Sequence, residues 1–108
     1  MQFYDAEFAV FLSDTKGVSE NTVVSYKRDL SNFFKYLAQT GINDFNSITA
    51  ITLSAYTLYL QNCRKASSTI SRSVASLKCY FSFLYSQNKI SSNPALKMEA
   101  PKVDKKLP

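Results

Sequence analysis

The chain has 108 residues, of which 45% are hydrophobic, two are glycine and three are proline. This length suffices for one domain with a modest core, and the apolar content excludes a disordered chain. Because glycine and proline are too scarce for the turns of a many-stranded sheet, we expect a single all-α domain.

The net charge of +5 is unevenly distributed. Residues 1–60 carry four bases and six acids, whereas residues 61–97 carry no acid and six bases, namely Arg64, Lys65, Arg72, Lys78, Lys89 and Lys97. Such asymmetry is typical of proteins that bind nucleic acid or an anionic membrane. A membrane is disfavoured, because no run approaches the roughly 18 apolar residues of a spanning helix and no signal peptide leads the sequence. We expect a cytoplasmic protein without a membrane partner.

The composition also excludes several kinds of chemistry. There is no histidine, so a Ser-His-Asp triad is impossible within this chain. Cys63 and Cys79 fall on separate predicted helices without a CxxC spacing, which leaves a zinc site without ligands and favours two free thiols. The acidic residues show no spacing that would pair two carboxylates in a cleft. We expect no catalytic residue, no metal and no cofactor.

The first predicted helix spans residues 3–14, with Tyr4, Phe8 and Phe11 on its apolar side. A second helix is expected from about residue 20 to 39, because Ser19 suits an N-cap, Gly41 suits a C-terminus, and apolar residues recur at steps of three and four. Its outward positions are Asn21, Ser25, Arg28, Asn32 and Lys35, with Thr22 and Lys27 beside them.

A third, shorter helix is predicted to begin after Thr52 as its cap. Arg64 and Lys65 follow it and lie just before the next helix. Helix N-termini bind phosphate through their free backbone N–H groups, so these two bases can mark a phosphate site. They can equally complement the C-terminus of the third helix, and both interpretations stay open.

The fourth predicted helix, residues 67–88, is the one around which the chain is organised. Its core stripe consists of Ile70, Val74, Leu77, Phe81 and Leu84. The opposite side carries small or hydroxylated residues and one guanidinium: Ser68, Arg72, Ser76, Cys79 and Ser82. Small side chains let a partner approach closely, and an arginine can hold a phosphate with two parallel hydrogen bonds. Serine-rich faces also occur on helices that touch nothing, so a docking face and an ordinary solvated face both remain open.

After this helix, Asn93 and Pro94 suit one further helical turn, with Leu96 and Met98 covering the end of the core. Residues 99–108 show no periodicity and read as an extended linker. We therefore divide the chain into a domain of residues 1–98 and an interdomain linker of residues 99–108.

Three stretches together carry a resemblance to a known family: SENTVVSYKRDLSNFFKYL at residues 19–37, SSTISRSVASLKCYFSFLYSQNKISSNPA at residues 67–95, and the closing APKVDKKLP. In this order they resemble the N-terminal, core-binding domain of tyrosine recombinases, also called phage integrases, particularly the Xer-like branch. The similarity covers nearly the whole chain.

The resemblance implies a SAM-like orthogonal bundle of four or five helices that forms one jaw of a clamp around double-stranded DNA. Its second and fourth helices would cross the major groove. It also implies a separate catalytic domain, whose arginines, histidine, lysine and tyrosine cleave and rejoin DNA strands. None of that set maps onto this sequence, so this chain alone is expected not to cut DNA.

By position, the resemblance places on the DNA-facing side Thr22, Ser25, Lys27, Arg28, Ser68, Arg72 and Ser76. We expect phosphate contacts from Lys27, Arg28, Arg64, Lys65 and Lys78. Arg72 is the best candidate for a base edge. Family members often carry more arginines at the start of the fourth helix than this single one, so we expect modest affinity from the isolated domain.

In the family, the N-terminal helix contributes to contacts between recombinase protomers on DNA. Other protomers are therefore expected partners, and the fragment is expected to be monomeric without DNA. The aromatic residues of the first helix can also be ordinary core. The alternative from another class is a helical, SAM-like protein-interaction module that is basic but does not bind DNA.

Overall fold

The computed structural model describes residues 5–98, and all regular structure in this part of the chain is helical. Its elements are α1 (Asp5–Val10), a π-helical turn η1 (Phe11–Thr15), α2 (Glu20–Thr40), a 3-10 turn η2 (Phe45–Ser47), α3 (Ala50–Asn62) and α4 (Ser67–Ser86). The expected all-α domain is confirmed, with four α-helices among the described residues. The predicted linker, residues 99–108, lies outside the described residues, as does Tyr4.

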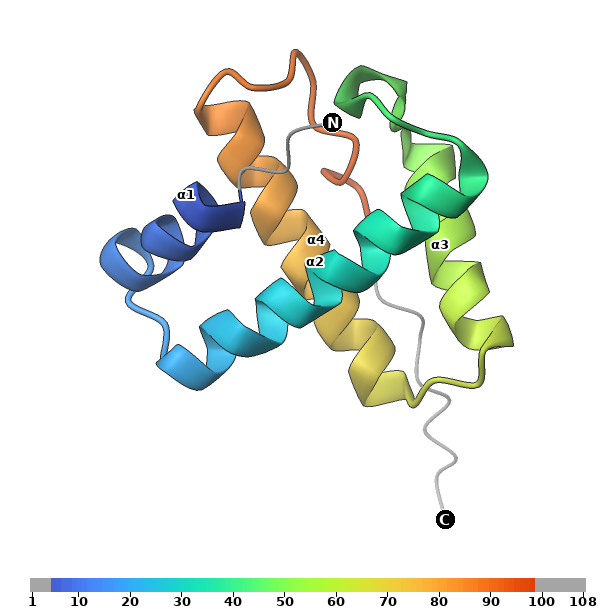
Figure 1. Ribbon diagram of the computed structural model, residues 1–108, viewed down its shortest axis with the longest axis horizontal. Helices are drawn as coiled ribbons and strands as arrows, with labels where there is room; N and C mark the ends of the chain where they lie inside the picture. The colour runs from blue at the N-terminus through green and yellow to red at the C-terminus, as the bar shows by residue number, and fades with distance from the viewer. Residues whose placement is uncertain (1–4, 99–108) are drawn as a thin grey trace.

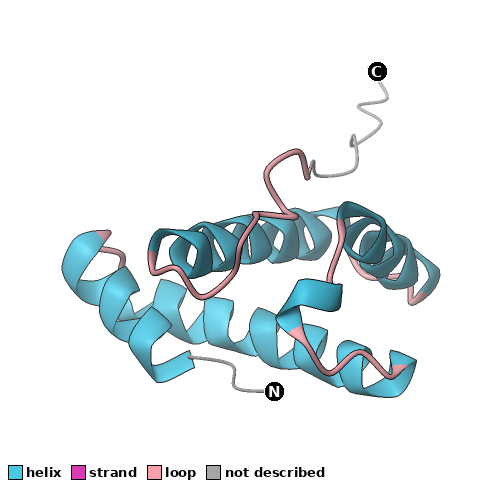
Figure 2. Ribbon diagram, turned by 90° about the horizontal axis from the view of Figure 1, so that it is seen from above, coloured by secondary structure: helices cyan, strands magenta, loops and turns pink. Residues whose placement is uncertain are grey.

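The two long helices, α2 and α4, cross in the middle of the domain, with α1 at one side and α3 at the other (Figure 1). Figure 2 shows the same helices from above, joined by short loops and turns. The crossing brings the middle of α2 against the first half of α4, although these segments lie far apart in the sequence. This contact between α2 and α4 positions the candidate functional site.

Aromatic side chains fill the core around the crossing. Phe33 of α2 meets the rings of Tyr56 of α3 and Phe81 of α4 edge-on, with centroids 5.0 and 6.2 Å away. Phe8 of α1 is fully buried, and its ring lies edge-on to that of Tyr80 of α4 at 5.2 Å. Because one aromatic core draws on all four α-helices, it stabilises their relative placement.

The predicted ends of α2 are confirmed to within one residue. At the start, the Ser19 hydroxyl accepts a hydrogen bond from the Thr22 N–H at 3.2 Å. At the end, Gly41 adopts a left-handed conformation with φ of +82°, and the Ile42 N–H donates to the Leu37 carbonyl at 3.0 Å. This pattern satisfies carbonyls that the helix itself leaves unpaired.

The predicted start of the third helix is wrong by three residues, because α3 begins at Ala50 and its cap is Thr49. The Thr49 hydroxyl accepts from the Thr52 N–H at 3.3 Å, and the Thr52 hydroxyl accepts from the Thr49 N–H at 3.2 Å. Two threonines three residues apart can satisfy each other's backbone in this way only when the first of them is the cap.

The first helix is also less regular than expected. After Val10 the α-helix changes into the wider π-helical turn η1. There the Lys16 N–H donates to the Phe11 carbonyl, five residues earlier, at 3.1 Å. Gly17 then turns the chain toward α2 with a φ of +65°.

Beyond α4, which ends at Ser86 rather than residue 88, the structure shows a turn and not another helix. The Asn93 side-chain oxygen accepts from the Ala95 N–H at 2.9 Å, and Ala95 is buried. Leu96 is 71% exposed, so the prediction that it covers the core is wrong. Met98 is partly buried and packs against the core as predicted, and Ala95 packs there as well.

Candidate nucleic-acid interface

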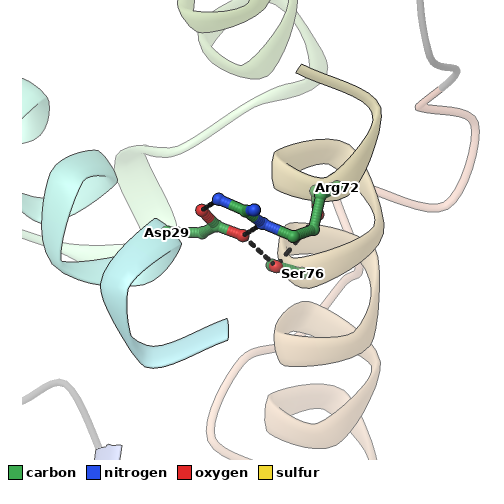
Figure 3. A network of polar contacts seen from close by, with 3 residues as sticks. All are labelled: Asp29, Arg72 and Ser76. Atoms are coloured by element: carbon green, nitrogen blue, oxygen red, sulfur yellow. Dashed lines mark hydrogen bonds and ion pairs between the residues drawn. The ribbon is translucent and has the colours of Figure 1, made fainter. Parts of the chain in front are cut away.

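A three-residue polar cluster joins α2 to α4 where they cross (Figure 3). The Asp29 carboxylate of α2 accepts hydrogen bonds from two nitrogens of Arg72 of α4, from Nε to Oδ2 at 3.0 Å and from Nη2 to Oδ1 at 2.9 Å. Oδ2 is also 2.8 Å from the Ser76 hydroxyl, which can donate to it. The same hydroxyl lies 2.9 Å from the Arg72 carbonyl, one turn earlier on α4. The cluster therefore pins one helix to the other through charge-assisted hydrogen bonds.

The two charges of this pair differ greatly in exposure. The Asp29 side chain is 3% exposed, whereas the Arg72 side chain is 40% exposed. The hydrogen bonds to Asp29 and the attraction of its negative charge raise the pKa of Arg72 above its ordinary value. The arginine is therefore charged at any physiological pH, and its exposed part is the side of the cluster that solvent or a ligand can reach.

Ser76 does not lie on an open face as the sequence analysis expected. It is completely buried, and its neighbour Ser73 is buried as well. The reason is the crossing itself, because a small side chain at this position lets α2 approach α4 while the hydroxyl supplies a donor to Asp29. By contrast, Ser68 and Ser82 are exposed, as expected for positions opposite the core stripe.

Asp29 is the member of this cluster that was not singled out from the sequence. It lies beside the apolar stripe of α2, directly before Leu30, and a buried carboxylate at such a position requires a partner. The signal in the sequence that could have identified Asp29 was an acidic residue on the inner side of a predicted helix. Identifying its partner required the position of Arg72, which only the crossing of the helices defines.

The remaining bases of the candidate surface lie in the open. Exposed side chains are those of Lys27 and Arg28 on α2, Arg64 and Lys65 between α3 and α4, and Lys78 on α4. Among the described residues, the structure records no ion pair for any of these five, since the only ion pair is the one between Arg72 and Asp29. Their charge is therefore available to a polyanion.

Three hydroxyl-bearing candidates complete the surface. Ser68 is exposed near the start of α4, whereas Thr22 and Ser25 on α2 are half-buried. The Thr22 hydroxyl is also within 2.9 Å of the Ser19 hydroxyl, so it shares in the cap of α2.

The connection between α3 and α4 bears on the proposed phosphate site. Arg64 takes a positive φ of 59°, and the Lys65 N–H donates to the Leu60 carbonyl at 3.2 Å, so backbone groups close the end of α3. At the start of α4 the N-cap is Ala66, and no side chain caps the helix. The geometry is compatible with both roles considered for these two bases.

Other chemistry finds little support in the described part of the chain. Cys63 and Cys79 are free thiols, and burial raises the pKa of the Cys79 thiol. No three metal-ligating side chains gather anywhere within residues that the structure describes. Over the same residues, no helix has the length and apolar character needed to cross a membrane.

The described chain is thus an all-α domain in which two long helices cross and five exposed bases have no ion pair among the described residues. The family model described as "Phage integrase, N-terminal SAM-like domain" matches residues 6–88, and the chain belongs to this family. The family resemblance that the sequence motifs indicated is therefore confirmed.

Curated relatives support the same family. The tyrosine recombinase XerC of Herpetosiphon aurantiacus is 32% identical over 100% of this chain and 35% of its own length. The tyrosine recombinase XerD of Rickettsia prowazekii is 36% identical over 95% of this chain and 33% of its own length. A protein of Caldanaerobacter subterraneus named as a tyrosine recombinase is 39% identical over 94% of this chain and 35% of its own length. The chain thus spans about a third of the length of these relatives. No solved structure matches it.

Proposed function

We propose that this chain is the DNA-binding N-terminal arm of a site-specific tyrosine recombinase that acts in DNA recombination or integration. The observation that carries the proposal is that five exposed bases, on α2, on α4 and between α3 and α4, have no ion pair among the described residues. Asp29, which follows Arg28 in the sequence, is already bound to Arg72 and is almost inaccessible. Exposed bases without an ion pair attract the phosphate backbone of DNA.

In this proposal, α2 and α4 cross the major groove, which is wide enough to admit an α-helix. Phosphate contacts come from Lys27, Arg28, Arg64, Lys65 and Lys78, and polar contacts come from Thr22, Ser25 and Ser68. Arg72 reads a base edge. Ser76 takes no direct part, because it is buried and bound to Asp29.

Strand cleavage and rejoining belong, in this proposal, to the part of the recombinase that this chain does not contain. The chain contributes binding energy and position on DNA, and it needs no metal or cofactor for that task. Other protomers bound to the same DNA are its expected protein partners, with α1 as one contact surface. Phe8 is core, so the contact would be made by neighbours such as Val10, which is 59% exposed.

The first test is fluorescence anisotropy of the chain on two short duplexes, one with a Xer-like half-site and one with the same bases scrambled. If the domain contacts on the order of five phosphates, affinity should fall by roughly two to three decades between 50 and 200 mM salt. Tighter binding to the half-site would support a sequence-reading arm. Equal but salt-dependent binding would keep DNA binding and move specificity elsewhere in the recombinase.

A second candidate function is a helical protein-interaction module, and one observation favours it. α3 carries no charged residue, and its outer side exposes 80% of Ile51 and 56% of Leu58. Apolar residues that are exposed together are typical of protein contacts. Absence of DNA binding at 50 mM salt would favour this function over the first.

A further inference from the structure

We infer that Asp29 is a positioning residue for DNA reading, which holds Arg72 so that the free edge of its guanidinium faces a base pair. The inference rests on the proposed DNA-binding function. It assigns a role to a buried acid that itself touches no DNA.

The donor inventory of Arg72 supports this role. A guanidinium has five N–H donors, one on Nε and two on each terminal nitrogen. Asp29 takes the Nε donor and one donor of Nη2 (Figure 3), and within residues 5–98 no hydrogen bond is recorded from the third nitrogen, Nη1. The second donor of Nη2 and the two donors of Nη1 therefore remain. One from each nitrogen forms a second parallel pair, which matches the O6 and N7 acceptors of guanine in the major groove.

The unequal exposure of the pair supports the same role. The carboxylate is 3% exposed and the arginine side chain 40% exposed, so the accessible part of the cluster belongs to the arginine. The Ser76 hydroxyl gives the carboxylate a third donor from the buried side, which limits its rotation. An arginine already fixed in one conformation loses less side-chain entropy when it binds a base.

The charge of the pair gives the inference a distinctive consequence. Arg72 and Asp29 neutralise each other, so together they add little to the attraction of phosphates. An Asp29→Asn substitution would release an uncompensated positive charge at the crossing while loosening the guanidinium. Binding to scrambled DNA should then become tighter and more salt-dependent, while preference for the specific site falls. A purely structural role of Asp29 would instead weaken binding to both duplexes by the same factor.

The experiment first selects the preferred duplex from a randomised pool with the wild-type 108-residue chain. Affinities for that duplex and for its scrambled counterpart are then measured for the wild type and for Asp29→Asn. We expect the ratio of the two affinities to fall by roughly 5- to 100-fold, the discrimination of one bidentate arginine–guanine pair. The salt slope on scrambled DNA should steepen by about 0.9, equivalent to one added phosphate contact. Asp44→Asn is the matched control, since it removes the same charge at an exposed position outside the crossing.

A second variant covers the case in which Asp29→Asn does not fold. Arg72→Lys keeps the positive charge, but an ammonium group has no second pair of parallel N–H donors. This variant should therefore lose the preference for the selected duplex while keeping the salt slope. If Asp29→Asn or Arg72→Lys folds and keeps the wild-type ratio of the two affinities, the inference is overturned while the proposed function stands. A wild-type chain that binds DNA but enriches no sequence from the randomised pool would also overturn the inference. No DNA binding by the wild type would overturn the proposed function itself.

Discussion

The carboxylate of Asp29 is the one buried charge among the described residues, and all of its donors come from another helix. An Arg72→Ala substitution would leave it with Ser76 as its single donor. Breaking a buried pair in this way typically costs about 3–5 kcal/mol, and we expect the lower end because Arg72 itself is partly exposed. Chemical denaturation measures this loss of unfolding free energy. Lys78→Ala, an exposed change on the same helix, should stay within about 0.5 kcal/mol of the wild type.

A second prediction at the residue level concerns alkaline pH. Burial, followed by the charge of Asp29, raises the pKa of the Tyr56 hydroxyl far above its ordinary value. The unfolded chain then loses this proton more readily than the folded one, so the stabilisation is complete below about pH 10 and is lost as pH rises further. Melting temperature should fall above that pH in the wild type and fall less in Tyr56→Phe. An equal fall in both chains would show that Tyr56 is not responsible.

The same residues show what sequence reasoning can reach. The five apolar residues predicted for the inner stripe of α4 are all buried, because the 3.6-residue period reports directly on which side is buried. The prediction left out Tyr80 and Phe83, which are also buried because the packed helices cover a wider side of α4 than one stripe. Ser76 was placed wrongly because a small polar residue fits both a solvated face and a close helix crossing. Distinguishing the two requires knowing what lies opposite, and the sequence places Asp29 in another helix with no local link to α4.

At the level of elements, helix ends were predicted where one residue type has a strong backbone preference. Gly41 marks the end of α2 because its φ of +82° is costly for residues with a side chain. The start of α3 was missed because Thr49 and Thr52 have the same capping chemistry, and only the complete hydrogen-bond pattern separates them. The π-helical turn after α1 has no comparable sequence signal, and a regular helix was predicted there.

Gly41 also gives a prediction at this level. A Cβ at this position would meet nothing within 4 Å, so Gly41→Ala carries only the backbone cost of the left-handed conformation. We expect a loss of about 1–2 kcal/mol in unfolding free energy, measured by denaturation. Gly41→Asn should lose less, because asparagine tolerates this conformation better than alanine. Equal stability of Gly41→Ala and the wild type would mean that the end of α2 rearranges without cost.

For the whole molecule, the sequence predicted the excess of positive charge and its concentration in residues 61–97, but not which bases are paired. The structure shows that Arg72 is neutralised by a buried partner while other bases remain unpaired within the described residues. The two groups should therefore act differently on DNA. We expect the unpaired bases to supply general attraction to phosphates and the paired arginine to supply preference for a particular DNA sequence.

Lys27 tests this division, because it is exposed on α2 and has no ion pair among the described residues. Lys27→Ala should weaken binding to every duplex by the same factor and lower the salt slope by about 0.9, the effect of one lost phosphate contact. Preference for the selected site should not change, since phosphate contacts carry no sequence information directly. Anisotropy titrations across salt measure both quantities. Lys97→Ala removes the same charge from an exposed position outside the proposed surface and should change neither. If Lys27→Ala altered preference, or if both variants weakened binding equally, the proposed surface around the α2–α4 crossing would be misplaced.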